Sequence, residues 1–206
     1  MTGTHKKITI KVWDRFVRGH HWGLVGLFAT AYLSGSYGWG LTHEWAGYTL
    51  CVFLLARILW GFIGSEHARF KNFLFSPKTK WHFLRNHLRG KHVPVRYVGH
   101  NPAGGAMVFL LIATLLMLLM TGLATLATTD FWGPLWPFLR DVNDSLARQI
   151  RQWHEWLANG ILVLVGLHLA GVVFTSLIHK ENLVRAMITG KKTIRIHNNQ
   201  EEGIHT

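Results

Sequence analysis

The sequence predicts an all-α integral membrane protein, built as a four-helix bundle with both termini in the cytoplasm. Of its 206 residues, 49% are hydrophobic and only 16% are charged, which is too apolar for an ordinary basic soluble domain. Four apolar stretches are long enough to span a hydrocarbon layer, which takes about 17–25 residues. They lie at about residues 22–39, 45–63, 103–127 and 155–178. We expect the whole chain to form one membrane domain.

The placement of the basic residues predicts the orientation of these spans. The formal net charge is +12, and the Lys and Arg residues cluster before the first span, in the 64–99 loop and after the last span. Apolar runs separate the three groups, which is the positive-inside pattern of a membrane protein and not a groove for phosphates. Both termini and the 64–99 loop should therefore lie on the cytoplasmic side of a bacterial inner membrane, and we expect no nucleic-acid partner.

Local signals refine the remaining segments. Asn101 and Pro102 suit the N-cap and the first turn of the helix that forms the third span. Asp141–Trp153 has the pattern of an amphipathic helix that lies on the outer surface. After the last span, Glu181–Thr189 should form a short interfacial helix, followed from about residue 190 by a polar, disordered cytoplasmic tail.

Two histidines of the last span give the most specific signal for a cofactor. His154 and His168 are 14 residues apart, which is close to four helical turns, or about 21 Å. Their imidazoles leave the same helix face, one near each side of a hydrocarbon layer about 30 Å thick. Because an ionisable side chain at membrane depth is costly and usually functional, the stacked pair predicts two redox centres.

The topology gives each of these histidines a partner on another span. His43 enters the second span from the outside and shares the outer level with His154, whereas His21 enters the first span from the inside and shares the inner level with His168. Two pairs at two heights are what two bis-histidine b-type haems require, with the imidazoles as ligands of the haem iron. His20 is an alternative to His21. The competing interpretation is four separately hydrogen-bonded histidines at helix ends.

An arginine in the second span predicts a polar neighbour for the inner site. Arg57 lies 14 residues after His43, so it is on the same helix face and near the inner level. Because an unpaired arginine there would be expensive, we expect it to bind a haem propionate or a quinone oxygen. Snorkelling to the inner headgroups is the alternative. Arg18 and His100 are further candidates for propionate or quinone contacts.

Other chemistries find no support in the sequence. The single cysteine, Cys51, excludes the CxxCH attachment of a c-type haem and makes a cysteine-ligated iron–sulfur cluster implausible. The sequence contains no paired carboxylates, Ser-His-Asp set or phosphate loop, so we expect no catalytic residue of hydrolytic or phosphoryl-transfer chemistry.

The ordered histidine motifs resemble those of the bacterial cytochrome b561 family, which includes the b-type cytochrome subunits of nickel–iron hydrogenases. The resemblance covers about residues 11–192 and implies a membrane bundle with two haem b groups, held by His21, His43, His154 and His168. The segments that carry it are VWDRFVRGHHW, THEWAGYTL, ARILWGFIGSEHARF, GHNPAGG, WHEWLANGILVLVGLHLAGV and HKENLVRAMITGKK.

The resemblance implies electron exchange between the quinone pool of a respiratory chain and a redox partner, which leaves three hypotheses. The chain is an electron-transfer subunit for a c-type cytochrome or a hydrogenase-like protein, or a self-sufficient oxidoreductase that oxidises superoxide and reduces ubiquinone, or a structural or transport membrane protein without haem. Self-association into a homo-oligomer is compatible with each of them.

The outer loops discriminate between the first two hypotheses. An oxidase of superoxide needs a positive outer funnel to steer the anion, whereas the outer loops are nearly neutral, which favours the partner hypothesis. The aromatic residues of the second outer loop could form the docking face, or alternatively an interfacial belt. They are Phe131, Trp132, Trp136 and Phe138.

Overall fold

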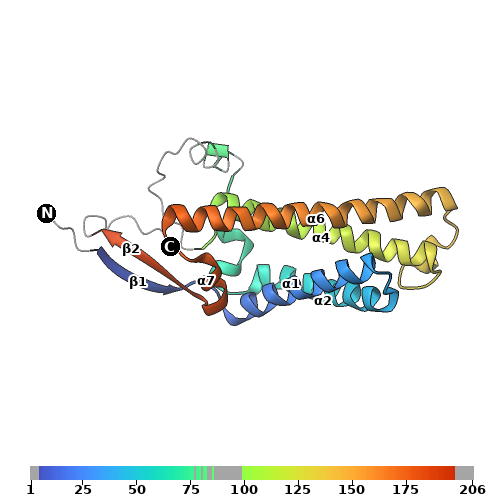
Figure 1. Cartoon of the computed structure of the whole chain (residues 1–206), viewed down its shortest axis with the longest axis horizontal. Helices are drawn as coiled ribbons and strands as arrows, with labels where there is room; N and C mark the ends of the chain where they lie inside the picture. The colour runs from blue at the N-terminus through green and yellow to red at the C-terminus, as the bar shows by residue number, and fades with distance from the viewer. Residues whose placement is uncertain (1–4, 77, 80, 83–84, 86–98, 198–206) are drawn as a thin grey trace. The chain divides into compact units, whose positions relative to one another are not determined.

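The computed structural model describes residues 5–76, 78–79, 81–82, 85 and 99–197, and these residues are mostly helical, as predicted (Figure 1). The elements in chain order are β1 (His5–Lys11), α1 (Arg15–Ser36), α2 (Gly40–Ile63), the 3-10 turns η1 (Glu66–Ala68) and η2 (Phe70–Asn72), α4 (Pro102–Thr129), α5 (Trp136–Leu139), α6 (Asp144–His179), α7 (Leu183–Thr189) and β2 (Lys191–His197).

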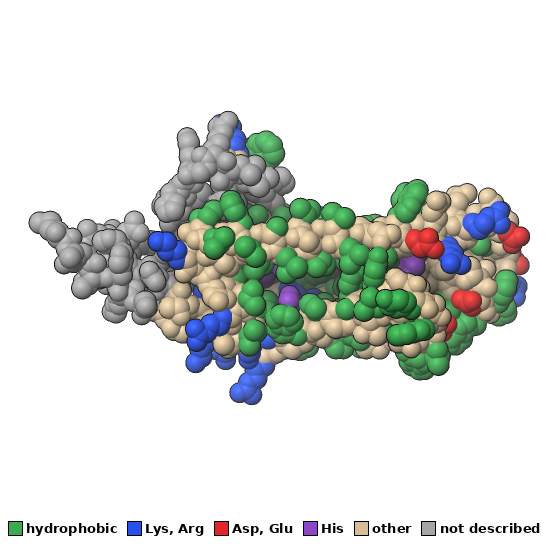
Figure 2. Space-filling model, viewed as in Figure 1, with side chains coloured by type: hydrophobic (Ala, Val, Ile, Leu, Met, Phe, Trp, Pro, Cys, Tyr) green, Lys and Arg blue, Asp and Glu red, His purple; other side chains and the backbone are tan. Residues whose placement is uncertain are grey.

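Three of the described helices, α2, α4 and α6, are long and apolar enough to cross a membrane. Their apolar side chains face outward: Leu59 is 63% exposed, Val163 64% and Leu177 72%. Figure 2 shows hydrophobic side chains over the visible face of the helices. An exposed apolar surface of this extent would make a soluble domain aggregate, but lipid requires it. The chain is therefore an integral membrane protein.

Helix α1 does not reach the same hydropathy, although the sequence predicts a span at 22–39. It starts earlier, at Arg15, because Asp14 caps it: the Val17 N–H donates to Asp14 Oδ1 at 2.7 Å. The added first turns carry two arginines and two histidines. The helix ends at Ser36, and Gly38 follows with a φ of 75°, a conformation that glycine adopts without strain.

The Asp141–Trp153 segment is not a separate surface helix, so that prediction is wrong. Helix α6 begins at Asp144, where Asn143 Oδ1 accepts from the Leu146 N–H at 2.9 Å, and continues unbroken to His179. Its 36 residues rise by about 54 Å, well beyond a hydrocarbon layer of about 30 Å. The amphipathic pattern therefore belongs to the first turns of a long helix.

The terminal segments form a two-stranded antiparallel sheet, which the all-α prediction does not contain. Strands β1 and β2 pair in a register that runs from His5↔His197 to Lys11↔Lys191. The predicted disordered tail is therefore wrong for residues 191–197, and residues 198–206 lie outside the described part of the chain.

The short helix predicted at 181–189 is confirmed as α7. Asn182 caps it by accepting from the Arg185 N–H at 2.7 Å, and Gly190 ends it with a φ of 78°. The mostly buried Lys192 ammonium then lies 2.8 Å from the buried Glu181 carboxylate, which ties β2 to the end of α6.

The contacts within the chain define two compact units. The tail unit comprises residues 1–21, 57–108 and 168–206, and the pocket unit comprises residues 22–56 and 109–167. Each unit therefore contains portions of α1, α2, α4 and α6. We describe each unit by itself.

Different contacts hold each unit together. In the tail unit, Asp14 Oδ2 accepts hydrogen bonds from Trp60 Nε1 at 3.1 Å and from Ser65 Oγ, which joins the start of α1 to the end of α2. In the pocket unit, Tyr32 Oη of α1 donates to Asn159 Oδ1 of α6 at 2.9 Å. Leu50 of α2 is almost fully buried there.

Candidate functional site

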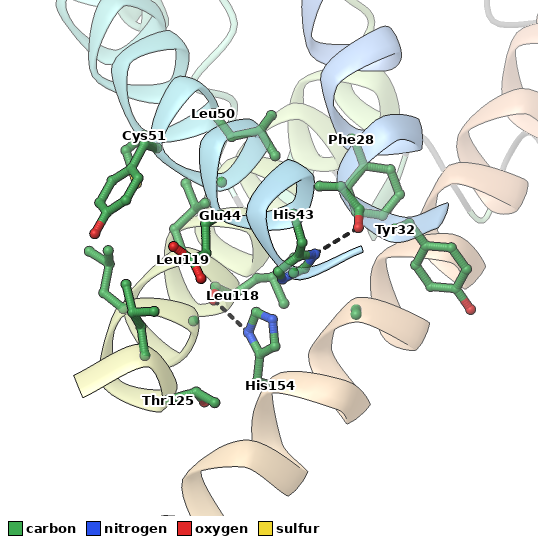
Figure 3. Close-up of a pocket in the computed structure, with 18 of the residues that line it drawn as sticks. Phe28, Tyr32, His43, Glu44, Leu50, Cys51, Leu118, Leu119, Thr125 and His154 are labelled. Atoms are coloured by element: carbon green, nitrogen blue, oxygen red, sulfur yellow. Dashed lines mark hydrogen bonds between the residues drawn. The ribbon is translucent and has the colours of Figure 1, made fainter. Parts of the chain in front are cut away.

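The pocket unit contains a cavity lined by α1, α2, α4 and α6 (Figure 3). Its volume is about 210 Å³, which is below the range of about 300–1,000 Å³ for cofactor sites. The lining is mostly apolar, with Phe28, Leu50 and Leu118 among its side chains, and it also includes two imidazoles, those of His43 and His154.

The two imidazoles of this pocket have the spacing of a metal-binding pair. The ring centroids of His43 and His154 lie 6.0 Å apart, with an angle of 85° between the ring planes. A metal–imidazole bond measures about 2.0–2.1 Å, and adding about 1.1 Å from each nitrogen to its ring centre gives about 6.3 Å between two opposed ligands. The pair therefore fits one metal ion held between two imidazoles.

Hydrogen bonds fix the tautomer of both rings. His43 Nδ1 lies 2.8 Å from the Ala31 carbonyl oxygen, and His154 Nδ1 lies 3.1 Å from the Leu118 carbonyl oxygen (Figure 3). His154 Nδ1 also lies 3.3 Å from Thr121 Oγ1. Because a carbonyl can only accept, each Nδ1 carries the proton, and each Nε2 keeps its lone pair for a metal. Such bonds orient metal-ligating histidines.

The tail unit contains the second imidazole pair. The ring centroids of His21 and His168 are 6.4 Å apart, with 48° between the ring planes, so this spacing also fits one metal ion. The alternative ligand, His20, is buried, and its ring stacks on Phe16 at 5.5 Å. The structure thus brings His21 to His168, while the role of these residues as haem ligands stays a prediction.

Arg57 is buried in the tail unit without a full set of hydrogen bonds. Its side chain lies over the Phe70 ring, 5.1 Å from the centroid, and the residue is only 8% exposed. Its Nη1 atom has no hydrogen-bond partner among the described residues. Burial of this degree does not suit a side chain that snorkels to headgroups, and the unpaired donor would suit an acceptor oxygen of a ligand.

His100 presents a second unpaired atom in the tail unit. Its ring lies 4.8 Å from Trp13 and 4.5 Å from Phe73, and its buried Nδ1 has no hydrogen-bond partner among the described residues. Burial, followed by the positive charge of Arg57, lowers the pKa of His100 to about 3, so the imidazole is neutral near pH 7. The neighbouring residue Asn101 caps α4, as predicted, by accepting from the Gly104 N–H at 2.7 Å.

Arg18 is engaged elsewhere in the tail unit. Its Nε donates to the Asp14 carbonyl oxygen at 3.3 Å, and its Nη1 donates to the Ile188 carbonyl oxygen. It therefore joins the start of α1 to α7. The structure does not group Arg18 with Arg57 as a candidate contact for a propionate or a quinone.

Three acidic residues were missed by reasoning from the sequence. Glu44 and Asp130 line the cavity with the imidazole pair, and only the position of Glu44 next to His43 gave a signal. Burial tends to raise the pKa of Asp14, but hydrogen bonds from Ser65, from Trp60 and from backbone N–H groups outweigh it and lower the pKa below its ordinary value. No local sequence pattern indicates the contacts of Asp14 with Ser65 and Trp60.

Paired imidazoles on apolar membrane helices are the donor set of a b-type cytochrome, in which axial histidines hold the haem iron. The sequence model of the family described as prokaryotic cytochrome b561 matches residues 12–190. The chain therefore belongs to that family. It is a membrane b-type cytochrome of electron transfer, and this membership implies haem b as its cofactor.

Similar proteins come from several bacteria, and each is named "Probable Ni/Fe-hydrogenase B-type cytochrome subunit" or a numbered form of that name. The protein of Bradyrhizobium diazoefficiens is 27% identical, over 91% of this chain and 87% of its own length. The protein of Azotobacter vinelandii is 26% identical, over 90% and 89%. The protein of Escherichia coli is 25% identical, over 74% and 69%.

Proposed function

We propose that the chain holds two haem b groups and transfers electrons between the quinone pool and a redox protein. The observation that carries the proposal is the spacing of the two imidazole pairs, 6.0 Å for His43 with His154 and 6.4 Å for His21 with His168. When bound, haem b supplies reversible one-electron transfer. The four imidazoles would hold the iron atoms, and the Ala31 and Leu118 carbonyls fix the tautomers of the two pocket-unit rings.

Arg57 and His100 are the proposed contacts for a haem propionate or a quinone. The unpaired Nη1 of Arg57 would donate to an oxygen of either group, and leaving it unpaired costs about 1–3 kcal/mol. His100 adds a neutral imidazole that hydrogen-bonds without introducing a second buried charge.

The proposed orientation places the tail unit on the cytoplasmic side of a bacterial inner membrane. Of the 22 Lys and Arg residues, all but Arg140, Arg148 and Arg151 belong to the tail unit, which is what the positive-inside rule requires of cytoplasmic segments. Helix α1 would then serve as the fourth span of a four-helix bundle, since its 22 residues rise by about 33 Å.

The proposed partner is a soluble or membrane-attached redox protein, either a c-type cytochrome or a hydrogenase-like protein. The similar proteins are named as subunits of nickel–iron hydrogenases, which supports a hydrogenase as the partner. The self-sufficient oxidation of superoxide is less favoured, because Glu44 and Asp130 line the cavity and their carboxylates repel an anion. Exposed aromatics such as Phe131 and Phe138, 67% and 82% exposed, are available for docking or for an interfacial belt.

The test is purification from the native membrane together with any bound partner. We expect two haem b per chain, a reversible reduced-minus-oxidised optical spectrum, and quinol-linked electron transfer only when the partner is present. A preparation without a Soret band would contradict the cytochrome assignment. Rapid quinone reduction by superoxide without a partner would favour the alternative function.

A further inference from the structure

Both histidines of the pocket unit contact a neighbouring helix at a glycine. A Cβ atom built on Gly35 of α1 would lie 2.9 Å from His43 Nδ1, and one built on Gly122 of α4 would lie 2.9 Å from His154 Cε1. These separations are shorter than real Cβ contacts. Neither imidazole could keep its position if the glycine carried a side chain.

Each imidazole donates to a carbonyl that lies on the same helix as the glycine it contacts, at the same sequence separation in both cases. Ala31 precedes Gly35 by four residues, and Leu118 precedes Gly122 by four residues. A helical side chain covers the turn on the N-terminal side of its own Cα, so a residue at either glycine position would cover the carbonyl four residues earlier. Glycine leaves that oxygen accessible to the imidazole, beside its helical hydrogen bond and the hydroxyl of Ser34 or Thr121 that donates to the same oxygen.

We propose that Gly35 and Gly122 are positioning residues for the haem held by His43 and His154. They open the Ala31 and Leu118 carbonyl oxygens to the imidazoles, which keeps the proton on Nδ1 and leaves Nε2 for the iron. The same arrangement occurs on two different helices of one unit, and Thr121 adds a second acceptor only at His154. This inference rests on the proposed function.

The test compares four alanine variants. Gly35→Ala and Gly122→Ala should cover the carbonyl oxygens of Ala31 and Leu118. Gly19→Ala and Gly166→Ala are controls: both glycines are exposed and helical, and a Cβ on either meets nothing within 4 Å. Each control also lies two residues before a histidine of the tail-unit pair, or about 200° around its helix. Because alanine favours a helix over glycine by about 0.5–1 kcal/mol, a weakened helix cannot explain a loss.

We expect Gly35→Ala and Gly122→Ala to weaken retention of the pocket-unit haem by about 10–100-fold, as loss of outer hydrogen bonds does at metal sites. Retention is measured against a haem-scavenging apoprotein. The pocket-unit haem that remains should have a higher reduction potential, because an imidazole without the carbonyl bond is a weaker donor to ferric iron. The tail-unit haem should be retained, and both controls should keep both haems.

Two outcomes would overturn the inference. In one, the two variants retain both haems with wild-type affinity and potential. In the other, they lose both haems together, which would indicate a general effect on folding. The proposed function fails separately, if the wild-type protein lacks haem or if His154→Ala leaves the haem content unchanged.

Discussion

The pocket unit and the tail unit each contain one pair of imidazoles, but their formal net charges have opposite signs. The pocket unit contains three Arg and no Lys against five Asp and Glu, so its formal net charge is −2. The tail unit contains the other 19 basic and five acidic residues, so its formal net charge is +14. Net charge and hydrogen bonding tune the potential of a metal centre. Two metal centres with the same type of ligands can therefore have different reduction potentials.

A second difference between the two units acts in the same sense. In the pocket unit, both imidazoles donate to backbone carbonyls, which makes them stronger donors to ferric iron. In the tail unit, the buried cation Arg57 favours the reduced, less positive iron. We therefore expect the haem of the tail unit to have the higher reduction potential.

The largest expected effect is the loss of one haem at a time. His43→Ala and His154→Ala should remove the pocket-unit haem and leave the high-potential step in an optical redox titration, because each removes one axial ligand. His21→Ala and His168→Ala should remove the tail-unit haem and leave the low-potential step. His20→Ala is the matched control and should keep both. The assignment of the two potentials is wrong if the pocket-unit variants lose the high-potential step and the tail-unit variants lose the low-potential step.

The next effect tests Arg57. Arg57→Gln keeps much of the side-chain length but removes the charge, and a hydrogen bond from a charged group contributes about 1.5–3 kcal/mol, or about 10–100-fold in binding. If Arg57 contacts quinone, KM for quinol should rise by that factor. If it contacts a propionate, the tail-unit haem should be released more easily and its potential should fall.

Arg140→Gln is the control for this experiment, because Arg140 is a well exposed residue of the pocket unit. Unchanged quinol kinetics together with an unchanged tail-unit haem in Arg57→Gln would exclude both roles for Arg57.

A smaller effect concerns the stability of the tail unit in acid. His100 has a pKa of about 3 in the folded protein, below the ordinary value of 6.5. The unfolded chain therefore binds the extra proton first, and the contribution of His100 to stability is lost as the pH falls from about 6.5 toward about 3. His100→Phe should flatten thermal stability against pH in the upper part of this window. An equally steep profile in the variant would show that His100 does not titrate as stated.

Asp14 titrates in a different window. Its pKa is lowered from 3.8, so its contribution is present above that value and is lost only as the pH falls through the still lower folded pKa. A difference between the wild type and His100→Phe in the interval between about pH 6.5 and about pH 4 therefore does not come from Asp14.

The parts of the molecule that follow from local patterns were predictable from the sequence. The spans α2, α4 and α6 follow from apolar length, and the grouping of four histidines follows from the 14-residue spacing and the antiparallel order of the spans. The start of α6 was missed, although Asn143 caps the helix and no glycine or proline separates its amphipathic turns from its apolar turns.

Features that depend on distant contacts could not be predicted. Strands β1 and β2 alternate as KKITIK and KKTIRIH, but their Thr9 and Thr193 partners are 184 residues apart in the chain, so no local signal links them. The same holds for Gly35: it stands between two serines near the end of α1, and only the approach of the His43 ring explains why it is a glycine.

The smallest expected effect leaves both haems in place and separates the two pairs by spectroscopy alone. The ring planes of His43 and His154 are 85° apart, whereas those of His21 and His168 are 48° apart. Perpendicular axial rings raise the two ferric dπ orbitals almost equally, and near-degenerate orbitals give the most anisotropic low-spin electron paramagnetic resonance signal. We therefore expect the more anisotropic signal to belong to the pocket unit, to vanish in His154→Ala and to persist in His168→Ala. If it vanishes in His168→Ala instead, the ring geometry of the two pairs is assigned to the wrong units.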